Sequence, residues 1–197
     1  MRKLLGFALL FLTLTSFTRR HTDEVTNYYG IPQVLSFDSV QYKLTASYHP
    51  QYNYYKQEYI PDGESADHFN KMVTIDFVLT NSPAKTLFAA KVKELIERKK
   101  NDPVVQYDLR GHPEKDEYIL DFTLSQNIGS KAGIVERNVY RYDSYTDSAG
   151  HKGILLFAIS QRGYGDNIVA FFGSLKRTRL DDIKKLGQYD MPKIEIK

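Results

Sequence analysis

The chain contains neither cysteine nor tryptophan among its 197 residues. Without cysteine it has no disulfide bonds, thiol nucleophile, cysteine-ligated zinc site or lipid-modified lipoprotein cysteine. The lack of tryptophan weakens the case for a surface that stacks against sugar rings. Signatures of catalysis are also missing, because no G-x-S-x-G elbow, H-E-x-x-H motif, Walker loop, G-x-G-x-x-G fingerprint or EF-hand loop occurs. The sequence therefore favours a non-catalytic protein without a cofactor.

The composition predicts one globular domain. Hydrophobic residues make up 42% of the chain and charged residues 26%, which excludes collagen, coiled coils and multi-span membrane proteins. The formal net charge is +3, but removing Arg2 and Lys3 from the 27 basic residues leaves 25 against 24 acidic ones. Such a balanced chain gives no support for binding the phosphate backbone of a nucleic acid.

The first residues are typical of a secretory signal peptide. Arg2 and Lys3 precede a weakly polar to apolar stretch over residues 4–17, which ends before Arg19 and Arg20. A bilayer core needs about 20 apolar residues, so this stretch is too short to span it. The alternative is a buried N-terminal helix. We predict a signal peptide over 1–18, a leader over 19–33, a single domain over 34–197, a periplasmic or secreted location, and no membrane span in the mature form.

Alternating apolar and polar residues indicate strands along most of the remaining chain. The expected strands cover residues 42–48, 54–60, 73–79, 118–124, 135–142, 154–160 and 167–174. Residues 154–159 and 168–172 are apolar at every position, so we expect them to form central strands covered on both faces by helices.

Two helices are predicted. Ser82 as cap, Pro83 at the first helical position and an apolar stripe from Ala84 to Ile96 predict the first helix, which ends before Pro103. The second is expected from Thr178 to Gly187, with Thr178 as the capping residue.

This order favours an α+β fold: a mainly antiparallel, twisted sheet of about seven strands with two packing helices. The succession of elements over residues 40–190, together with the Tyr59-Ile60-Pro61 turn, resembles the PsbP-like sheet of exported bacterial accessory and envelope proteins. The resemblance implies an accessory, binding or envelope-support role, and it assigns no functional residue.

Two polar groups are candidates for a site. Asp62, Glu64, Asp67 and His68 follow the second expected strand and could share a divalent ion or a proton, but their spacing matches no metal template, so a solvated loop is favoured. Asp143, Asp147 and His151 surround a glycine turn and form the second candidate, for which ordinary turn chemistry is the favoured interpretation.

Candidate binding residues come from two further features. Residues 162–167 (RGYGDN) are expected to form a loop between two apolar strands, where Arg162 could bind a carboxylate or phosphate beside Tyr164. The 15 tyrosines are numerous, and several lie on the first expected hairpin, where they could form a protein-contact face or pack across strands. The predicted binding residues are Tyr52, Tyr54, Tyr55, Tyr59, Arg162 and Tyr164.

The leading hypothesis is an exported domain that binds a protein or a cell-envelope component without covalent chemistry. One alternative is a metal-assisted or acid/base hydrolase that uses Asp62, Glu64, Asp67 and His68. Another is a small-ligand carrier with an apolar pocket of about 300 Å³ or more between sheet and helix.

Overall fold

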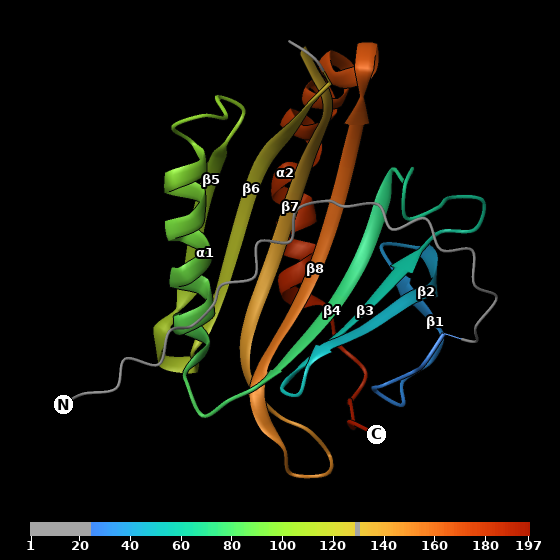
Figure 1. The fold of residues 1–197 in the computed structure, drawn as a ribbon, viewed down its shortest axis with the longest axis vertical. Coiled ribbons are helices and arrows are strands. Elements are labelled where there is room, and N and C mark those ends of the chain that lie inside the picture. Colours follow the sequence, from blue (N-terminus) through green and yellow to red (C-terminus); the bar gives the residue numbers. More distant parts are fainter. Residues whose placement is uncertain (1–24, 129–130) are drawn as a thin grey trace.

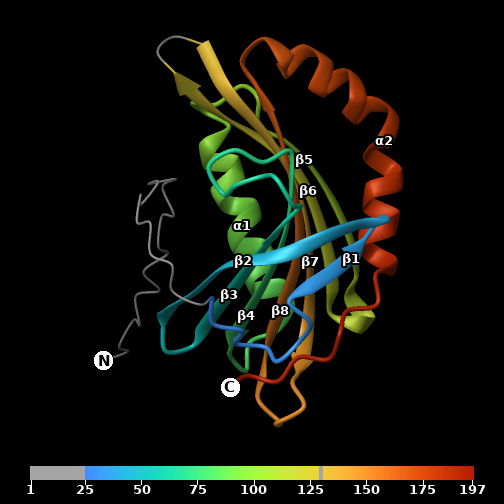
Figure 2. The ribbon, with the colours of Figure 1, turned by 90° about the vertical axis from the view of Figure 1, so that its right-hand side faces the viewer.

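The structure is a computed structural model that describes residues 25–128 and 131–197, so the predicted signal peptide lies outside the described residues. An eight-stranded sheet forms the centre of the fold, with α1 on one face and α2 on the other (Figures 1 and 2). The elements are β1 (Val34–Phe37), β2 (Val40–Gln51), β3 (Tyr54–Ile60), β4 (Lys71–Leu79), α1 (Ala84–Arg98), β5 (Gln106–His112), β6 (Glu117–Ile128), β7 (Lys131–Thr146), β8 (Lys152–Tyr164) and α2 (Ile168–Gln188).

The strand order across the sheet is β1-β2-β3-β4-β8-β7-β6-β5, and every neighbouring pair is antiparallel. The predicted α+β class, the antiparallel sheet and the two helices are therefore confirmed. The strand count differs, because the short edge strand β1 and the edge strand β5 were not predicted and one expected strand is a helix.

The strand predicted over residues 167–174 was wrong, because these residues begin α2. The predicted loop at 162–167 is instead the end of β8 followed by a 3₁₀ turn, in which Gly165 has a φ of +48°. Consequently the second helix starts ten residues before Thr178. A short apolar run fits a buried strand or a partly buried helix equally well, so periodicity alone could not decide between them.

The sheet separates two apolar clusters. Ile154, Leu156 and Ala158 of β8 pack in the cluster under α1, which includes Leu95 of that helix. The intervening Leu155, Phe157 and Ile159 pack in the larger cluster under α2, together with Ile183 and Leu186. Strand β8 is thus buried on both faces, as its continuous apolar sequence predicts.

Part of the segment predicted as a leader packs into the domain. Tyr29 is fully buried, and its hydroxyl donates to the carbonyl oxygens of Tyr55 at 2.7 Å and Ile75 at 3.1 Å. Its backbone N–H donates to the side chain of Gln57 at 3.1 Å. Ile31 is buried in the same cluster. These contacts make residues around Tyr29 part of the core on the α2 side.

Candidate functional site

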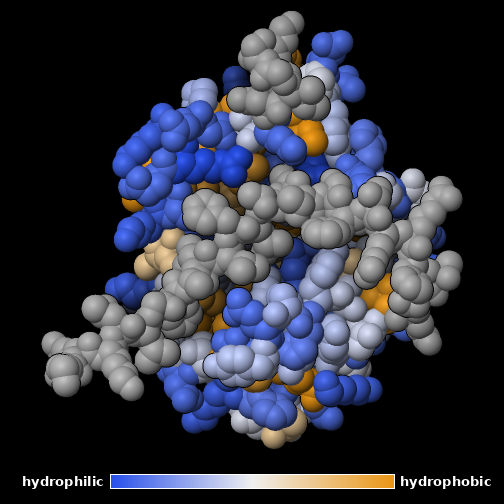
Figure 3. Space-filling model, in the orientation of Figure 1, coloured by the Kyte–Doolittle hydropathy of each residue, from blue (hydrophilic) through white to orange (hydrophobic). Residues whose placement is uncertain are grey.

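Helix α1 covers only part of its face of the sheet. It packs chiefly on β6, β7 and β8, while β2, β3 and β4 extend beyond it (Figure 1). In the same orientation, the visible surface outside the grey atoms is mostly hydrophilic, with apolar residues in small separate spots (Figure 3). The strand register places the polar side chains of Lys56 and Asp76 on this face beyond α1, whereas Leu156 of β8 lies in the apolar cluster under the helix.

The strand register brings several of these polar side chains together. Lys56 of β3 lies directly opposite Asp76 of β4, and Asp76 lies opposite Leu156 of β8, which packs under α1. Residues directly opposite each other in an antiparallel pair share one face. Two residues along β3, Glu58 accepts an ion pair from Lys56 Nζ at 2.7 Å. Lys56 is thus already paired along its own strand.

Asp76 is the most perturbed acid of this face. Burial raises the pKa of its carboxyl to about 6, although the positive charge of Lys56 opposes the shift; the negative charge of Glu58 adds to it, and a hydrogen bond from Tyr54 lowers it. Its Oδ1 atom is buried and has no hydrogen-bond partner among the described residues. Asp76 therefore offers an acceptor oxygen that this part of the chain does not satisfy.

Two tyrosines, Tyr54 and Tyr140, are affected by the charge of this carboxylate. Burial, followed by the charge of Asp76, raises the pKa of Tyr54. Burial also raises the pKa of Tyr140, helped by the nearby carboxylates of Glu136, Asp76, Glu94 and Glu58. Both hydroxyls consequently remain protonated at neutral pH and can donate hydrogen bonds.

The same face continues towards the end of β8. Arg162 Nε donates to Glu136 Oε2 at 2.6 Å, and its guanidinium lies 4.0 Å from the ring centroid of Phe69. Tyr164 stacks against His68 with ring centroids 4.1 Å apart. We name this region the α1-side polar surface, and it consists of Tyr54, Lys56, Glu58, Asp76, Glu136, Tyr140, Arg162 and Tyr164.

The predicted binding residues do not form one contact face. Tyr54, Arg162 and Tyr164 lie on the α1-side polar surface, whereas Tyr59 is fully buried on the α2 side and binds Gln57. Tyr55 lies on the α2 side as well, where it stacks on His49 at 4.1 Å. Tyr52 is 88% exposed at the β2–β3 turn. Strand alternation separates these tyrosines, since neighbours along a strand point to opposite faces.

The four candidate metal ligands are not brought together. Both carboxylate oxygens of Glu64 accept hydrogen bonds from Asn70, and the ring of His68 lies against Tyr164. Within residues 25–128 and 131–197, no three histidine or acidic side chains are arranged to hold a metal ion. Asp62, Glu64, Asp67 and His68 therefore do not form such a group in the described structure, and the metal-assisted hydrolase stays an untested alternative.

The second polar group also has a structural role. Asp147 pairs with the His151 ring at 2.9 Å and accepts the backbone N–H of Ile196 at 3.0 Å. Asp143 instead pairs with Arg141 at 2.9 Å. Asp147 thereby links the C-terminal segment to the β7–β8 turn by a hydrogen bond.

Sequence reasoning missed Lys56, Glu58, Asp76, Glu136 and Tyr140 as site residues. One signal was present, because Asp76 is the only charged residue between Met72 and Leu79, in a strand that is otherwise mostly apolar. A charge at such a position indicates a face that is not covered by apolar groups. The groups around Asp76 could not be found in this way, since they come from other strands, β3 and β7.

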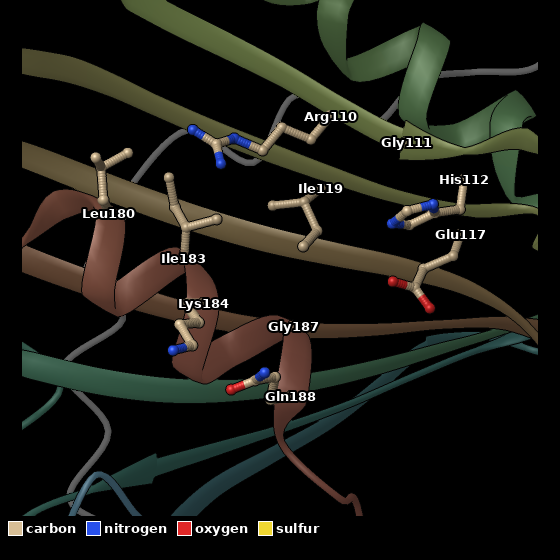
Figure 4. Close-up of a pocket in the computed structure, with 10 residues that line it drawn as sticks. All are labelled: Arg110, Gly111, His112, Glu117, Ile119, Leu180, Ile183, Lys184, Gly187 and Gln188. Atoms are coloured by element: carbon tan, nitrogen blue, oxygen red, sulfur yellow. The ribbon is translucent and has the colours of Figure 1, made fainter.

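A pocket of about 350 Å³ lies between the β5–β6 edge and α2. Figure 4 shows Ile119 of β6 opposite Leu180 and Ile183 of the helix, with His112 and Glu117 together at one end. Arg110, His112, Glu117, Lys184 and Gln188 supply a polar half of the lining. The pocket is therefore more polar than the apolar cavity expected of a small-ligand carrier. That function stays a hypothesis, and this pocket is the place where a ligand would bind.

In the described part of the chain, no helix combines the length and apolar character needed to cross a membrane. Comparison with curated proteins and with solved structures found no match. Residues 29–191, which include every strand and both helices, match the model of a protein family. Because this match covers well over half of the chain, the protein belongs to that family.

Proposed function

We propose that the protein is an exported, non-catalytic α+β domain that binds a protein or a cell-envelope component through the α1-side polar surface. The signal-peptide pattern supports export, and the lack of catalytic motifs supports a binding role. The resemblance in element order to PsbP-like proteins favours an accessory role as well. The partner presents a basic group to Asp76.

The observation that carries this proposal is the unpartnered Oδ1 of Asp76. The charged side chains beside it, Lys56 and Glu58, are paired with each other. A buried carboxylate oxygen without a donor costs stability, and such perturbed groups collect at functional sites. A donor supplied by a partner would remove that cost, and an ammonium or guanidinium group would do so most effectively.

The charges around Asp76 favour a cation over an anion. Because Lys56–Glu58 and Arg162–Glu136 are neutral as pairs, ionised Asp76 adds the net negative charge of this surface. The hydroxyl of Tyr54 hydrogen-bonds to Asp76, so the ring of Tyr54 could flank a cationic group bound there. Since the pKa of Asp76 is about 6, binding of a cation should be strong at pH 8 and weaken towards pH 5.

A quantitative co-purification tests the proposal. The mature protein, Asp76→Asn and the control Asp62→Asn are each immobilised and exposed to solubilised cell envelope at pH 8 and pH 5. Asp62 is exposed in the β3–β4 connection, so its change matches the charge lost at Asp76 without touching the surface. We expect wild type and control to retain a partner at pH 8, and Asp76→Asn to retain about tenfold less of it or lower still. A loss of that size corresponds to one charge-assisted hydrogen bond.

The pH 5 arm should mimic the Asp76→Asn variant, because protonation also removes the charge. Circular dichroism of each variant establishes that it is folded. Identical partner sets for all three proteins at both pH values would exclude Asp76 as a contact residue.

A further inference from the structure

The first turns of α2 expose apolar side chains at one end of the molecule. Figure 2 shows these turns arching away from the end of the sheet before the helix descends along its face. Val169 is 81% exposed, and Ile168 and Phe172 are only partly buried. Phe171, by contrast, packs against Gly163 of β8 and holds the turn to the sheet. The apolar sequence that suggested a central strand therefore lies at the surface.

Basic residues without ion pairs follow directly. Lys176 and Arg177 are exposed one to two turns after Phe172, and Lys184 is exposed beside Leu180, which is itself 67% exposed. Within the described residues, no ion pair joins Lys176, Arg177 or Lys184 to an acidic group, whereas the neighbouring Arg179 pairs with Asp121. The outer side of α2 thus combines exposed apolar groups with unpaired positive charge.

We propose that this outer side of α2, formed by Val169, Lys176, Arg177, Leu180 and Lys184 with the partly buried Ile168 and Phe172 at its edge, docks on an anionic lipid membrane. The apolar first turns would enter the boundary between headgroups and acyl chains, and the basic side chains would contact the lipid phosphates. The contact is peripheral, at the surface of one leaflet. It goes beyond the proposed function and does not depend on it, because α2 covers the opposite face of the sheet from Asp76.

Charge complementarity selects anionic lipid as the occupant. Lys176 and Arg177 lie next to the apolar turns, and Asp181 is already paired with Lys185 at 2.6 Å. Asp166, in the 3₁₀ turn before the helix, opposes the attraction. Binding should therefore weaken with salt, and Asp166→Asn should strengthen it.

Vesicle flotation with the mature chain tests the proposal. Vesicles of phosphatidylcholine with about one third phosphatidylglycerol are compared with pure phosphatidylcholine vesicles at low salt. We expect at least tenfold stronger partitioning into the anionic vesicles. Each basic residue neutralised should lower it about fivefold, so Lys176→Gln/Arg177→Gln should lose roughly 25-fold. Val169→Asp should abolish it.

The matched control is Lys85→Gln/Lys93→Gln, which removes the same charge from exposed positions on α1. Equal losses for control and α2 variants, or equal binding to neutral vesicles, would overturn the proposal. The proposal would also be overturned if the protein did not bind vesicles but formed a dimer that Val169→Asp dissociates. In that case a second copy of the chain would cover this face. Asp76→Asn should bind vesicles like wild type, which separates this test from that of the α1-side polar surface.

Discussion

Replacing Arg137 by methionine should destabilise the fold by about 3–5 kcal/mol. The side chain of Arg137 on β7 is 1% exposed and joins the sheet to α2. Its Nε donates to Asp121 at 2.9 Å, and its Nη1 donates to Asp182 of the helix at 2.5 Å and to Gln161 at 3.0 Å. Methionine keeps much of the apolar volume and removes every one of these donors.

The magnitude follows from what the two carboxylates retain. Asp121 keeps its contact with Arg179, so its charge remains paired. Asp182 keeps only the Thr178 hydroxyl at 3.2 Å, which leaves a buried and almost unpaired charge. Breaking a buried pair in this way costs far more than the pair contributes, because of the desolvation of the remaining ion. Adding Asp182→Asn should therefore recover a large part of the loss.

Urea denaturation followed by circular dichroism measures the effect. With a slope of roughly 2 kcal/mol per molar urea, the loss lowers the midpoint by about 1.5–2.5 M. Arg110→Met is the matched control, because the Arg110–Asp108 pair is exposed and its loss should cost less than about 1 kcal/mol. An Arg137 variant whose midpoint equals that of the control, or a double variant that recovers nothing, would refute the reasoning.

Three further substitutions should alter the free energy of unfolding. Asp76→Asn should raise the free energy of unfolding at pH 8 by about 3 kcal/mol and leave it unchanged below pH 4. The reason is that the carboxyl has a pKa of 3.8 in the unfolded chain and about 6 in the folded one, so wild type loses stability as the pH rises between these values. Urea titrations that show the same difference between variant and wild type at both pH values would contradict this. Gly163→Ala should destabilise the fold by about 1–3 kcal/mol, since its Cβ would lie 2.7 Å from Phe171. Gly173→Ala meets open space within α2 and should stabilise the fold by up to about 1 kcal/mol. Thermal melts in which both variants change the melting temperature in the same direction would count against this packing.

Local patterns were sufficient for most of the secondary structure. The alternation at residues 42–48 and 118–124 predicted β2 and β6, and the apolar stripe from Ala84 to Ile96 predicted α1. The prediction of Ser82 as the cap of α1 was wrong, because the helix begins after Pro83 and the carboxylate that accepts the N–H of Ala84 is that of Asp116 in the β5–β6 turn, 32 positions along the chain. Periodicity describes residues that are close in sequence, whereas Asp116 and Ala84 are far apart in it.

The sequence by itself determined the α+β class, the antiparallel sheet and the central burial of residues 154–159, because these depend on residue periodicity and apolar content. Only the tertiary structure decided that residues 168–172 are helical and partly exposed, and that β4 pairs with β8 so that Asp76 lies beside Leu156. The helical start of α2 depends on the turn at Gly165, and the position of Asp76 depends on the pairing of strands about 80 residues apart. Energies of that kind arise from packing and strand pairing, which no local pattern records.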